Sequence, residues 1–246
     1  MKRFFVNPDQ IDENQIRMTG SDVSHIRQVL RMKKGDELWV SDGEKKEYHC
    51  VIQETGEEEI LLEILYAQEP DYELPSRIYL FQGLPKGDKM EWIIQKTVEL
   101  GVHEIIPVAA KRCVVRLDEK KAAKKQARWQ EIAKSAAKQS RRLLVPQIRP
   151  VCSFEEALSY GSQMDVKLIP YELAEGMDYT RKVIREIQPG QSIGIFIGPE
   201  GGFAPEEAQR AKEAGVLPVT LGKRILRTET AGMAVLSVLM FQLEEE

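Results

Sequence analysis

Two glycine-bearing loops near the C-terminal end of the chain restrict its possible folds more than any other feature. The first follows Ile193–Ile197, an apolar run that predicts a strand buried on both faces, and reads Gly198-Pro-Glu-Gly-Gly202. Ala204-Pro-Glu-Glu207 then begins a predicted helix, with proline in the first turn and acids at the positive end of the helix dipole. A strand, a glycine loop and a helix in this order predict a ligand-binding edge of an α/β sheet.

The second loop follows another predicted strand, Val216–Leu221, and contains Gly222 with the basic residues Lys223, Arg224 and Arg227. Two such loops at neighbouring strand ends can hold one ligand between them. Neither loop has the G-x-x-x-x-G-K-[ST] pattern of a phosphate-binding loop, since Arg224 follows Gly222-Lys223, and G-x-G-x-x-G is also absent. Taken alone, the first loop is equally compatible with a tight turn that binds nothing.

Composition limits the class of protein. Hydrophobic residues make up 42% of the 246 residues and charged residues 30%, as in ordinary globular proteins of one or two domains. No apolar run reaches the ~18 residues of a membrane span, and the N-terminus lacks the apolar core of a signal peptide. The three cysteines are far apart and the three histidines have no metal-ligand spacing. We therefore expect a cytoplasmic protein with no disulfide framework and no metal site.

The distribution of charge favours nucleic acid more than the total does. The formal net charge is −4, but residues 111–149 contain thirteen basic and three acidic residues, a local net charge of +10. Residues 1–72 contain nine basic and sixteen acidic residues, a net charge of −7. Because local patches steer a polyanion, the basic segment predicts an RNA-binding helix. A solvated helix face is the alternative interpretation.

Residues 1–72 predict a small β-rich domain, followed by a proline-containing linker at 69–75. One helix interrupts it, capped by Ser21 or Asp22. Its predicted buried face consists of Val23, Ile26, Val29 and Leu30, and its basic edge of Arg27, Arg31, Lys33 and Lys34. The strands are predicted at Arg3–Val6, Glu37–Ser41, Glu47–Glu54 and Ile60–Tyr66.

Residues 73–246 predict an α/β domain with a largely parallel sheet, because strands alternate with helices. Besides those above, strands are predicted at Arg77–Gln82, Glu104–Val108, Cys113–Leu117 and Val166–Ile169, and a loop at Pro170–Gly176. Helices are predicted at Asp88–Leu100, Lys120–Arg142, Ser153–Ser159, Tyr179–Glu186 and Glu229–Leu243.

The last predicted helix is capped by Thr228 and is apolar almost all round, so it must be buried in the core or against a second subunit. It also carries small residues, Ala231, Gly232, Ala234 and Ser237, which predict the close approach of another backbone. Val235, Leu236, Leu239 and Phe241 form its other apolar side.

Gly198-Pro-Glu-Gly-Gly-Phe203, followed by Leu221-Gly-x-x-Ile-Leu-Arg-x-Glu-Thr-Ala231, closely resembles the RsmE family. Those enzymes are bacterial 16S ribosomal RNA uridine N3-methyltransferases of the SPOUT class. The resemblance extends to Arg3-Phe-Phe5, Val29-Leu-Arg31 with Gly35-Asp36, Glu99-Leu-Gly-Val102 and Gln139-Ser140. It implies a PUA-like RNA-binding β-barrel in residues 1–72 and a SPOUT methyltransferase domain in residues 73–246. It further implies a C-terminal trefoil knot and a homodimer that acts on the small ribosomal subunit.

The resemblance also implies roles for individual residues. S-adenosyl-L-methionine is expected to bind at Ile197, Gly198, Pro199, Glu200, Gly201, Gly202, Leu221, Gly222, Ile225, Leu226 and Thr228. The basic residues of the N-terminal domain and of the segment 111–149, and not the resemblance alone, predict the RNA contacts: Arg3, Arg27, Arg31, Lys33, Lys124, Lys125, Arg128 and Arg141.

For catalysis, uracil N3 becomes a nucleophile only when its proton leaves, so the site needs a base or a cation that stabilises the uracil anion. Arg227 is the expected cation and Glu200 the expected carboxylate near the sulfonium or the N3 proton, with Glu229 as a second carboxylate.

Two other functions remain open from the sequence. A methyltransferase of the same class acting on another RNA needs the same loops, although the N-terminal barrel and the second motif argue against a transfer RNA substrate. A noncatalytic RNA-binding assembly factor needs the basic surfaces but not the paired glycine loops.

Overall fold

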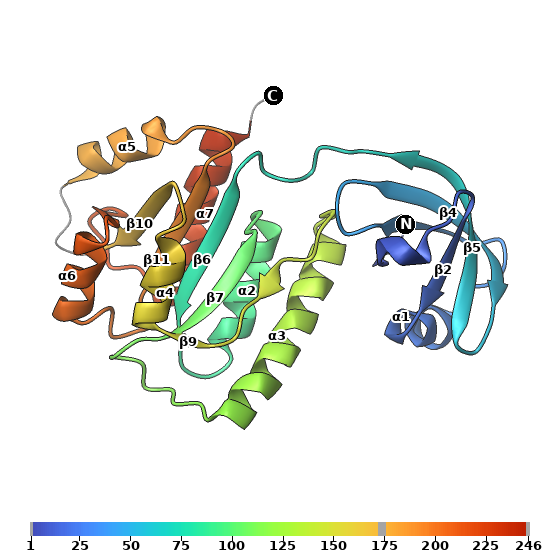
Figure 1. The fold of residues 1–246 in the computed structure, drawn as a ribbon, viewed down its shortest axis with the longest axis horizontal. Coiled ribbons are helices and arrows are strands. Elements are labelled where there is room, and N and C mark those ends of the chain that lie inside the picture. The colour runs from blue at the N-terminus through green and yellow to red at the C-terminus, as the bar shows by residue number, and fades with distance from the viewer. Residues whose placement is uncertain (1, 172–175, 245–246) are drawn as a thin grey trace. The chain divides into compact units, whose positions relative to one another are not determined.

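The computed structural model describes residues 2–171 and 176–244. The chain divides into two compact units (Figure 1). Unit 1 comprises Met1–Glu73 and Ala137–Val145, and unit 2 comprises Leu74–Ala136 and Pro146–Glu246. Within the described ranges, no helix is both long and apolar enough to cross a membrane. The predicted loop Pro170–Gly176 lies partly outside the described residues, which omit 172–175.

Unit 1 is built around sheet A, whose strand order is β1-β3-β4-β5-β2. All neighbouring strands are antiparallel except β1 and β3, which are parallel. The strands are β1 (Lys2–Phe5), β2 (Gln15–Thr19), β3 (Glu37–Ser41), β4 (Glu47–Thr55) and β5 (Glu59–Gln68). The short helices are η1 (Pro8–Gln10), α1 (Ser21–Ser24) and the π-helix η2 (His25–Val29).

The sequence predicted four of these strands and missed β2. In β2, Ile16 and Met18 are buried while the residues between and beside them are exposed, as expected where one face of a strand covers a core. Leu38 and Val40 of β3 follow the same alternation. These side chains join Phe4 in a single apolar core, so the N-terminal β-rich domain that the sequence predicts is confirmed.

The helix of unit 1 differs from its prediction at both ends. Its N-cap is Gly20, with a φ of 80°, rather than Ser21 or Asp22, because both of these residues already lie in the helix. The Asp22 carboxylate pairs with Lys138 at 2.8 Å. After Ser24 the chain forms a π-helix, whose wider turn changes the angular spacing of the side chains. Ile26 therefore remains buried, whereas Val29, predicted on the same buried face, is 66% exposed.

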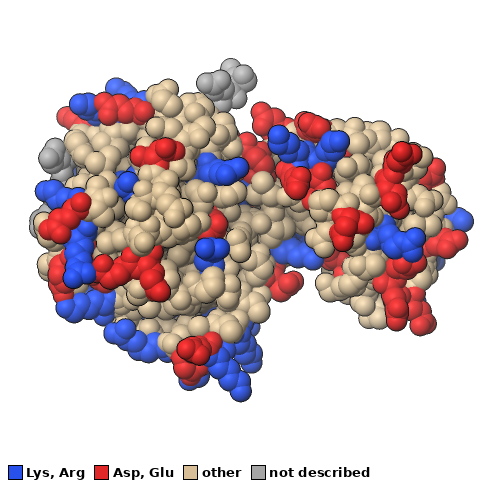
Figure 2. Space-filling view, viewed as in Figure 1, with Lys and Arg blue, Asp and Glu red and all other residues tan. Residues whose placement is uncertain are grey.

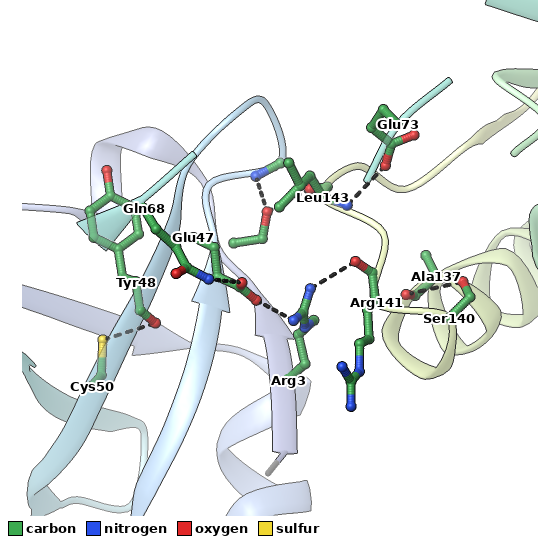
Figure 3. Close-up of polar contacts among 12 residues, drawn as sticks. Arg3, Glu47, Tyr48, Cys50, Gln68, Glu73, Ala137, Ser140, Arg141 and Leu143 are labelled. Carbon is green, nitrogen blue, oxygen red and sulfur yellow. Dashed lines mark hydrogen bonds and ion pairs between the residues drawn. The ribbon is translucent and has the colours of Figure 1, made fainter. Parts of the chain in front are cut away.

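Residues 137–145 belong to unit 1 although they lie far along the chain, and polar contacts hold them there (Figure 3). Arg3 donates to the Arg141 carbonyl at 2.8 Å and pairs with Glu47 at 2.5 Å. The Ser41 hydroxyl donates to the Leu143 carbonyl at 2.5 Å, and the Leu143 amide donates to Glu73 at 2.9 Å. This segment thereby completes unit 1.

Unit 2 is built around sheet B, in the order β12-β10-β11-β6-β7-β8, with β9 also on β7. Every strand pair is parallel, which confirms the predicted α/β class. The strands are β6 (Arg77–Gly83), β7 (Glu104–Ala109), β8 (Gln147–Ile148), β9 (Cys152–Ser153), β10 (Val166–Pro170), β11 (Ser192–Ile197) and β12 (Leu217–Val219). The helices are α2 (Lys89–Glu99), α3 (Glu119–Gln139), α4 (Phe154–Gly161), α5 (Met177–Glu186), α6 (Pro205–Glu213) and α7 (Thr228–Leu243).

Helix α7 is central to unit 2, because it packs on β6, β11 and α2 (Figure 1). Val235, Leu236 and Leu239 are buried as predicted, but Phe241 is 87% exposed. A Cβ at Gly232 would lie 3.7–3.8 Å from side-chain atoms, which is ordinary contact. The close backbone approach that the sequence predicted at Gly232 is therefore wrong within the described chain.

The predicted strand Cys113–Leu117 is also wrong. Both sides of β7 are already paired, with β6 on one side and β8 and β9 on the other, so β7 has no free edge for this segment. It forms an irregular loop in which Cys113 is buried and Val114 is 67% exposed. The apolar residues of this segment lie in a loop instead of a strand.

Candidate functional site

The carboxyl ends of β6 and β11 lie side by side, since Gln82 pairs in register with Ile197. The loops that follow these strands are in close contact. A Cβ on Gly83 would lie 2.6 Å from the Pro199 nitrogen, closer than real Cβ atoms come to other atoms. Gly83 is thus required for the first glycine loop to pack against β6, and the sequence analysis did not identify it.

The first glycine loop is a tight turn. The amide of Gly202 donates to the Pro199 carbonyl at 2.8 Å, and Gly202 has a φ of 65°, which favours glycine. A Cβ on Gly198 would lie 3.0 Å from the Gly202 backbone. The loop therefore depends on its glycines for its own shape, whether or not a ligand approaches it.

Thr228 connects this turn to the neighbouring strand. Its hydroxyl donates to the Gly198 carbonyl at 2.6 Å and accepts from Gln82 Nε2 at 2.8 Å, and both side chains are buried. The predicted cap role of Thr228 is wrong, because Arg227 is the N-cap and Thr228 is the first residue of α7. The hydroxyl fastens the ends of β6 and β11 to the start of α7.

Four charged side chains form a row beside the turn. Lys89 Nζ lies 2.9 Å from Glu200 Oε1 and 3.5 Å from Glu229 Oε2. Arg227 Nη1 lies 4.0 Å from Glu229 Oε1. The charges in this row alternate in sign. The four residues come from the first glycine loop, the start of α2 and the start of α7. Lys89 joins the two carboxylates that the sequence analysis considered separately.

Lys89 keeps Glu200 ionised. Burial alone would raise the pKa of Glu200, but the hydrogen bonds from Lys89 and from backbone amides, including that of Lys86 at 3.1 Å, lower it below its ordinary value. The same hydrogen bond raises the pKa of Lys89. A carboxylate with a lowered pKa is a weak base, so Glu200 is poorly suited to remove a proton.

The other side of the turn is covered by the loop that follows β7. Arg112 donates to the Gly201 carbonyl at 3.0 Å, and a Cβ on Gly201 would lie 3.3 Å from the Arg112 Cβ. Glu207, which is buried, accepts from the backbone amides of Lys111 and Ala204, each at 2.8 Å. A side chain at Gly201 would therefore first meet Arg112.

The second glycine loop is more open. Gly222 has a φ of 106°, and no atom lies within 4 Å of the position that a Cβ would occupy. Ile225 is 86% exposed, and the Arg227 side chain is 82% exposed. Leu221 and Leu226 are half-buried. This loop offers free backbone, apolar surface and an available guanidinium, which is a suitable lining for a nucleoside with a charged neighbour.

The structure thus brings together most of the residues predicted to bind the cofactor. Gly198 to Gly202 and Thr228 share one edge of sheet B, whereas the Ile197 side chain packs inward near Gly232. The contributions of Gln82, Gly83 and Lys89 were missed. The position of Gln82 and Gly83 at this edge followed from the predicted strand at 77–82, because parallel strands end at one edge. Their bonding partners, and the contribution of Lys89 on α2, did not follow from the sequence.

The residues predicted to contact RNA divide into free and engaged side chains. Arg27, Arg31, Lys33 and Lys124 are exposed, and so is Arg141. Arg31 and Arg141 have positive φ values of 54° and 64°, an uncommon conformation that often accompanies a functional constraint.

Two predicted RNA contacts are instead engaged in ion pairs. The Arg3 side chain is only 9% exposed and is held by Glu47. The Arg128 guanidinium pairs with Glu91 at 2.6 Å but remains 66% exposed. Figure 2 shows basic side chains, with a few acidic ones, gathered at the lower edge of unit 2, where α3 begins.

Two family models match the chain. The model described as the RNA methyltransferase domain matches residues 72–240, and the model described as the RNA methyltransferase PUA domain matches residues 18–65.

Full-length proteins are similar as well. A Bacillus subtilis protein named Ribosomal RNA small subunit methyltransferase E is 39% identical over 250 residues, which cover 99% of this chain and 98% of that protein. A solved structure of the protein of that name from Neisseria gonorrhoeae, bound to S-adenosyl methionine, is 38% identical with a TM-score of 0.84. A Legionella pneumophila methyltransferase with its cofactor SAM bound is 32% identical with a TM-score of 0.86. In both structural comparisons the match covers 97% of this chain and 96% of the other.

The matches extend over both units of the chain. We conclude that the chain belongs to the Ribosomal RNA small subunit methyltransferase E family of RNA methyltransferases.

Proposed function

We propose that this protein is an S-adenosylmethionine-dependent methyltransferase that modifies N3 of a uridine in 16S ribosomal RNA of the small subunit. The observation that carries the proposal is the row of alternating charges Glu200, Lys89, Glu229 and Arg227 beside two glycine loops, in a chain of this family. Relatives named for small-subunit methylation support the substrate class.

The residues present fit the cofactor. The open space at Gly222 and the exposed surface of Ile225 provide a backbone and apolar contact for a nucleoside, and Leu221 and Leu226 flank them. The turn at Gly198–Gly202 provides the opposite wall. When bound, the cofactor supplies an electrophilic methyl group on a sulfonium. The chain's own residues must then orient the uracil ring and handle the N3 proton.

Arg227 is suited to the charge that develops on the uracil oxygens as the N3 proton leaves. Its guanidinium is largely exposed and makes only a long 4.0 Å contact, so it is free to meet the substrate. Glu200 pairs with Lys89 and is a weak base, so the proton acceptor in this proposal is Glu229. Glu229 Oε2 is buried, has no hydrogen-bond partner among the described residues and lies 3.5 Å from Lys89 Nζ, so this oxygen is available to accept the proton.

The domain roles belong to the same proposal. Residues 1–72 act as the RNA-binding barrel, and residues 73–246 form the SPOUT methyltransferase domain with a C-terminal trefoil knot. The break between the two units at Glu73 and Leu74 supports these boundaries. The exposed side chains of Arg27, Arg31 and Arg141 supply phosphate contacts. The protein acts in the cytoplasm, where its ribosomal substrate is found.

A homodimer is the assembly that we propose. Val238 and Phe241 of α7 are 50% and 87% exposed, although this helix is otherwise largely buried. Covering such side chains with a second copy would remove apolar surface from water. Sedimentation of the wild type and of Phe241→Ser tests this assembly, since the substitution should produce monomers without unfolding the chain.

The function is tested by mass spectrometry of nucleosides from 16S ribosomal RNA of a deletion strain. The modified uridine should be absent and should return when the wild-type gene, but not Arg227→Ala, is supplied. Isothermal titration with S-adenosylmethionine separates the proposal from a noncatalytic assembly factor. A protein that binds ribosomal RNA but gives no heat with this cofactor would favour the assembly factor.

A further inference from the structure

A pocket in unit 2 is not used by the proposed chemistry. Its volume is about 210 Å³, and it lies between the loop after β6, the irregular segment before α3, and α3 itself. Its apolar lining comes from Leu84, Pro85, Met90, Val115, Leu117 and Trp129. At about 30 Å³ per water molecule, the space would hold roughly seven waters. That size suits one flat ring system better than a whole nucleotide.

Two polar groups and a buried aromatic ring give the pocket its chemistry. Asp88 and Lys125 are the charged lining residues, one an acceptor and the other a donor. Lys125 Nζ lies 5.8 Å from the centre of the Trp129 ring. Trp129 is only 2% exposed, so its ring forms part of a firm wall.

The surroundings of the pocket are basic. On α3, Lys121, Lys124 and Arg128 are exposed within one turn of Lys125. An apolar, ring-sized pocket beside a row of cations is the combination that binds single-stranded nucleic acid, with phosphates on the cations and a base in the pocket. A small apolar metabolite would not need these cations.

The pocket is close to the reacting groups but separate from them. Lys86, between the lining residues Pro85 and Gly87, donates its amide to Glu200 at 3.1 Å. Neither Glu200 nor Arg227 is among the described lining residues. The uridine to be methylated belongs with those two side chains, so a different base must occupy the pocket.

We propose that this pocket receives an unpaired base of the substrate RNA that neighbours the methylated uridine. The inference rests on the proposed function, because it takes RNA as the substrate. Asp88 accepts from the base and Lys125 donates to it. Each of the four bases carries at least one donor and one acceptor, so this pair of side chains orients a base in the pocket without by itself selecting which base binds.

Adjacent valines provide a matched pair of variants. Val115 lines the pocket, whereas Val114 is 67% exposed and does not. Val115→Trp should fill the pocket, and Val114→Trp adds the same ring outside it. The affinity of each protein for 16S ribosomal RNA is measured at several salt concentrations, together with S-adenosylmethionine affinity and the temperature of unfolding.

Val115→Trp should weaken RNA binding about tenfold or more, the magnitude of a lost base contact. The slope of log affinity against log salt should remain that of the wild type, because no phosphate contact is removed. Val114→Trp should bind RNA normally. If Val115→Trp is unfolded, Leu117→Phe replaces it as the filling variant.

A folded filling variant that binds RNA as tightly as Val114→Trp would overturn the pocket proposal, and so would a changed salt slope with normal affinity at low salt. Both outcomes are decided by measurements of RNA affinity, without any assay of methylation. A wild type that binds RNA but neither binds the cofactor nor methylates would refute the proposed function and leave the pocket result standing. A wild type with no affinity for this RNA would refute both.

Discussion

The hydroxyl oxygen of Thr228 lies 2.6 Å from the carbonyl oxygen of Gly198, to which it donates a hydrogen bond. The two residues are thirty positions apart, and the bond fixes the start of α7 against the first glycine loop. Gln82 donates to the same hydroxyl at 2.8 Å. The shape of the first glycine loop therefore depends on the side chain of Thr228.

Thr228→Val should destabilise the protein by about 1–3 kcal/mol, because the isosteric side chain leaves buried polar groups of Gly198 and Gln82 without this partner. Affinity for S-adenosylmethionine should fall as the loop loosens. Denaturant unfolding and calorimetric titration measure the two effects. Thr230→Val, an exposed position in the same helix, is the control. Equal stability of the two variants would show that the hydrogen bonds to Thr228 contribute little.

The ion pair between Lys89 and Glu200 predicts a pH dependence of stability. The folded-state pKa of Glu200 is lowered, so its contribution is present above its ordinary pKa and is lost as pH falls through the folded value. The pKa of Lys89 is raised, so its contribution persists through neutral pH and is lost only as pH rises through its folded value.

Lys89→Met should therefore be less stable than the wild type near neutral pH, and the difference should shrink in acid, once Glu200 is protonated. Denaturant unfolding across a pH series measures this. Lys86→Met is the matched control, because Lys86 contacts Glu200 through its backbone amide. A difference between wild type and Lys89→Met that does not change with pH would argue against the ion pair.

Arg227→Ala should lower the maximal rate of methylation by about 10²–10³-fold with cofactor and RNA affinities nearly unchanged, as expected for a group that acts on the transition state. Single-turnover methylation of purified small subunits measures the rate. Arg224→Ala, in the same loop, should retain most activity. A normal rate at saturating RNA, with weaker binding, would make Arg227 a phosphate anchor instead.

Gly232→Ala should stabilise the protein by about 1 kcal/mol, the difference in helix propensity between the two residues. The added methyl group fits, since its nearest neighbours are side-chain atoms of Leu80, Gln82 and Ile197 at 3.7–3.8 Å. The methyl group points toward these residues, so cofactor affinity should not change. Thermal unfolding is the measurement. A lower unfolding temperature would mean that α7 packs more tightly than these distances indicate.

Lys124→Gln should weaken RNA binding and lower the slope of log affinity against log salt by about one unit, the effect of one lost phosphate contact. Lys124 is exposed, whereas Arg128 on the same helix also pairs with Glu91 and would give a mixed result. Lys182→Gln, on α5, removes a comparably exposed lysine elsewhere in unit 2 and serves as the control. Identical slopes for all three proteins would identify the helix face as merely solvated.

The fold was largely predictable because its signals are local. Ile193–Ile197 and Arg77–Gln82 were predicted as strands, and the helix predicted at Asp88–Leu100 corresponds to α2. The errors arose where tertiary structure overrides a local pattern. Cys113–Leu117 is apolar apart from Arg116 and was predicted as a strand, but β7 has no free edge to pair with it. Val29 fits a helical face, but a π-helix turns it outward.

The site was predictable only in part. Glycine loops can be recognised from the sequence alone, so Gly198–Gly202 and Gly222 were identified. Lys89 and Gln82 could not be assigned in the same way, because their roles depend on partners more than a hundred residues away, Glu200 and Thr228. The local sequence predicted that Thr228 caps a helix. Its hydroxyl instead donates a hydrogen bond to the Gly198 carbonyl at the edge of the sheet.

The inclusion of residues 137–145 in unit 1 affects how the protein can be made. A growing chain that has released only its first 73 residues lacks the segment that Arg3, Ser41 and Glu73 bind. At synthesis rates of about 5–20 residues per second, residues 137–145 are added several seconds after residue 73. The N-terminal unit is therefore finished only after the two strands and two helices that follow its first part, β6, α2, β7 and α3, have been synthesised.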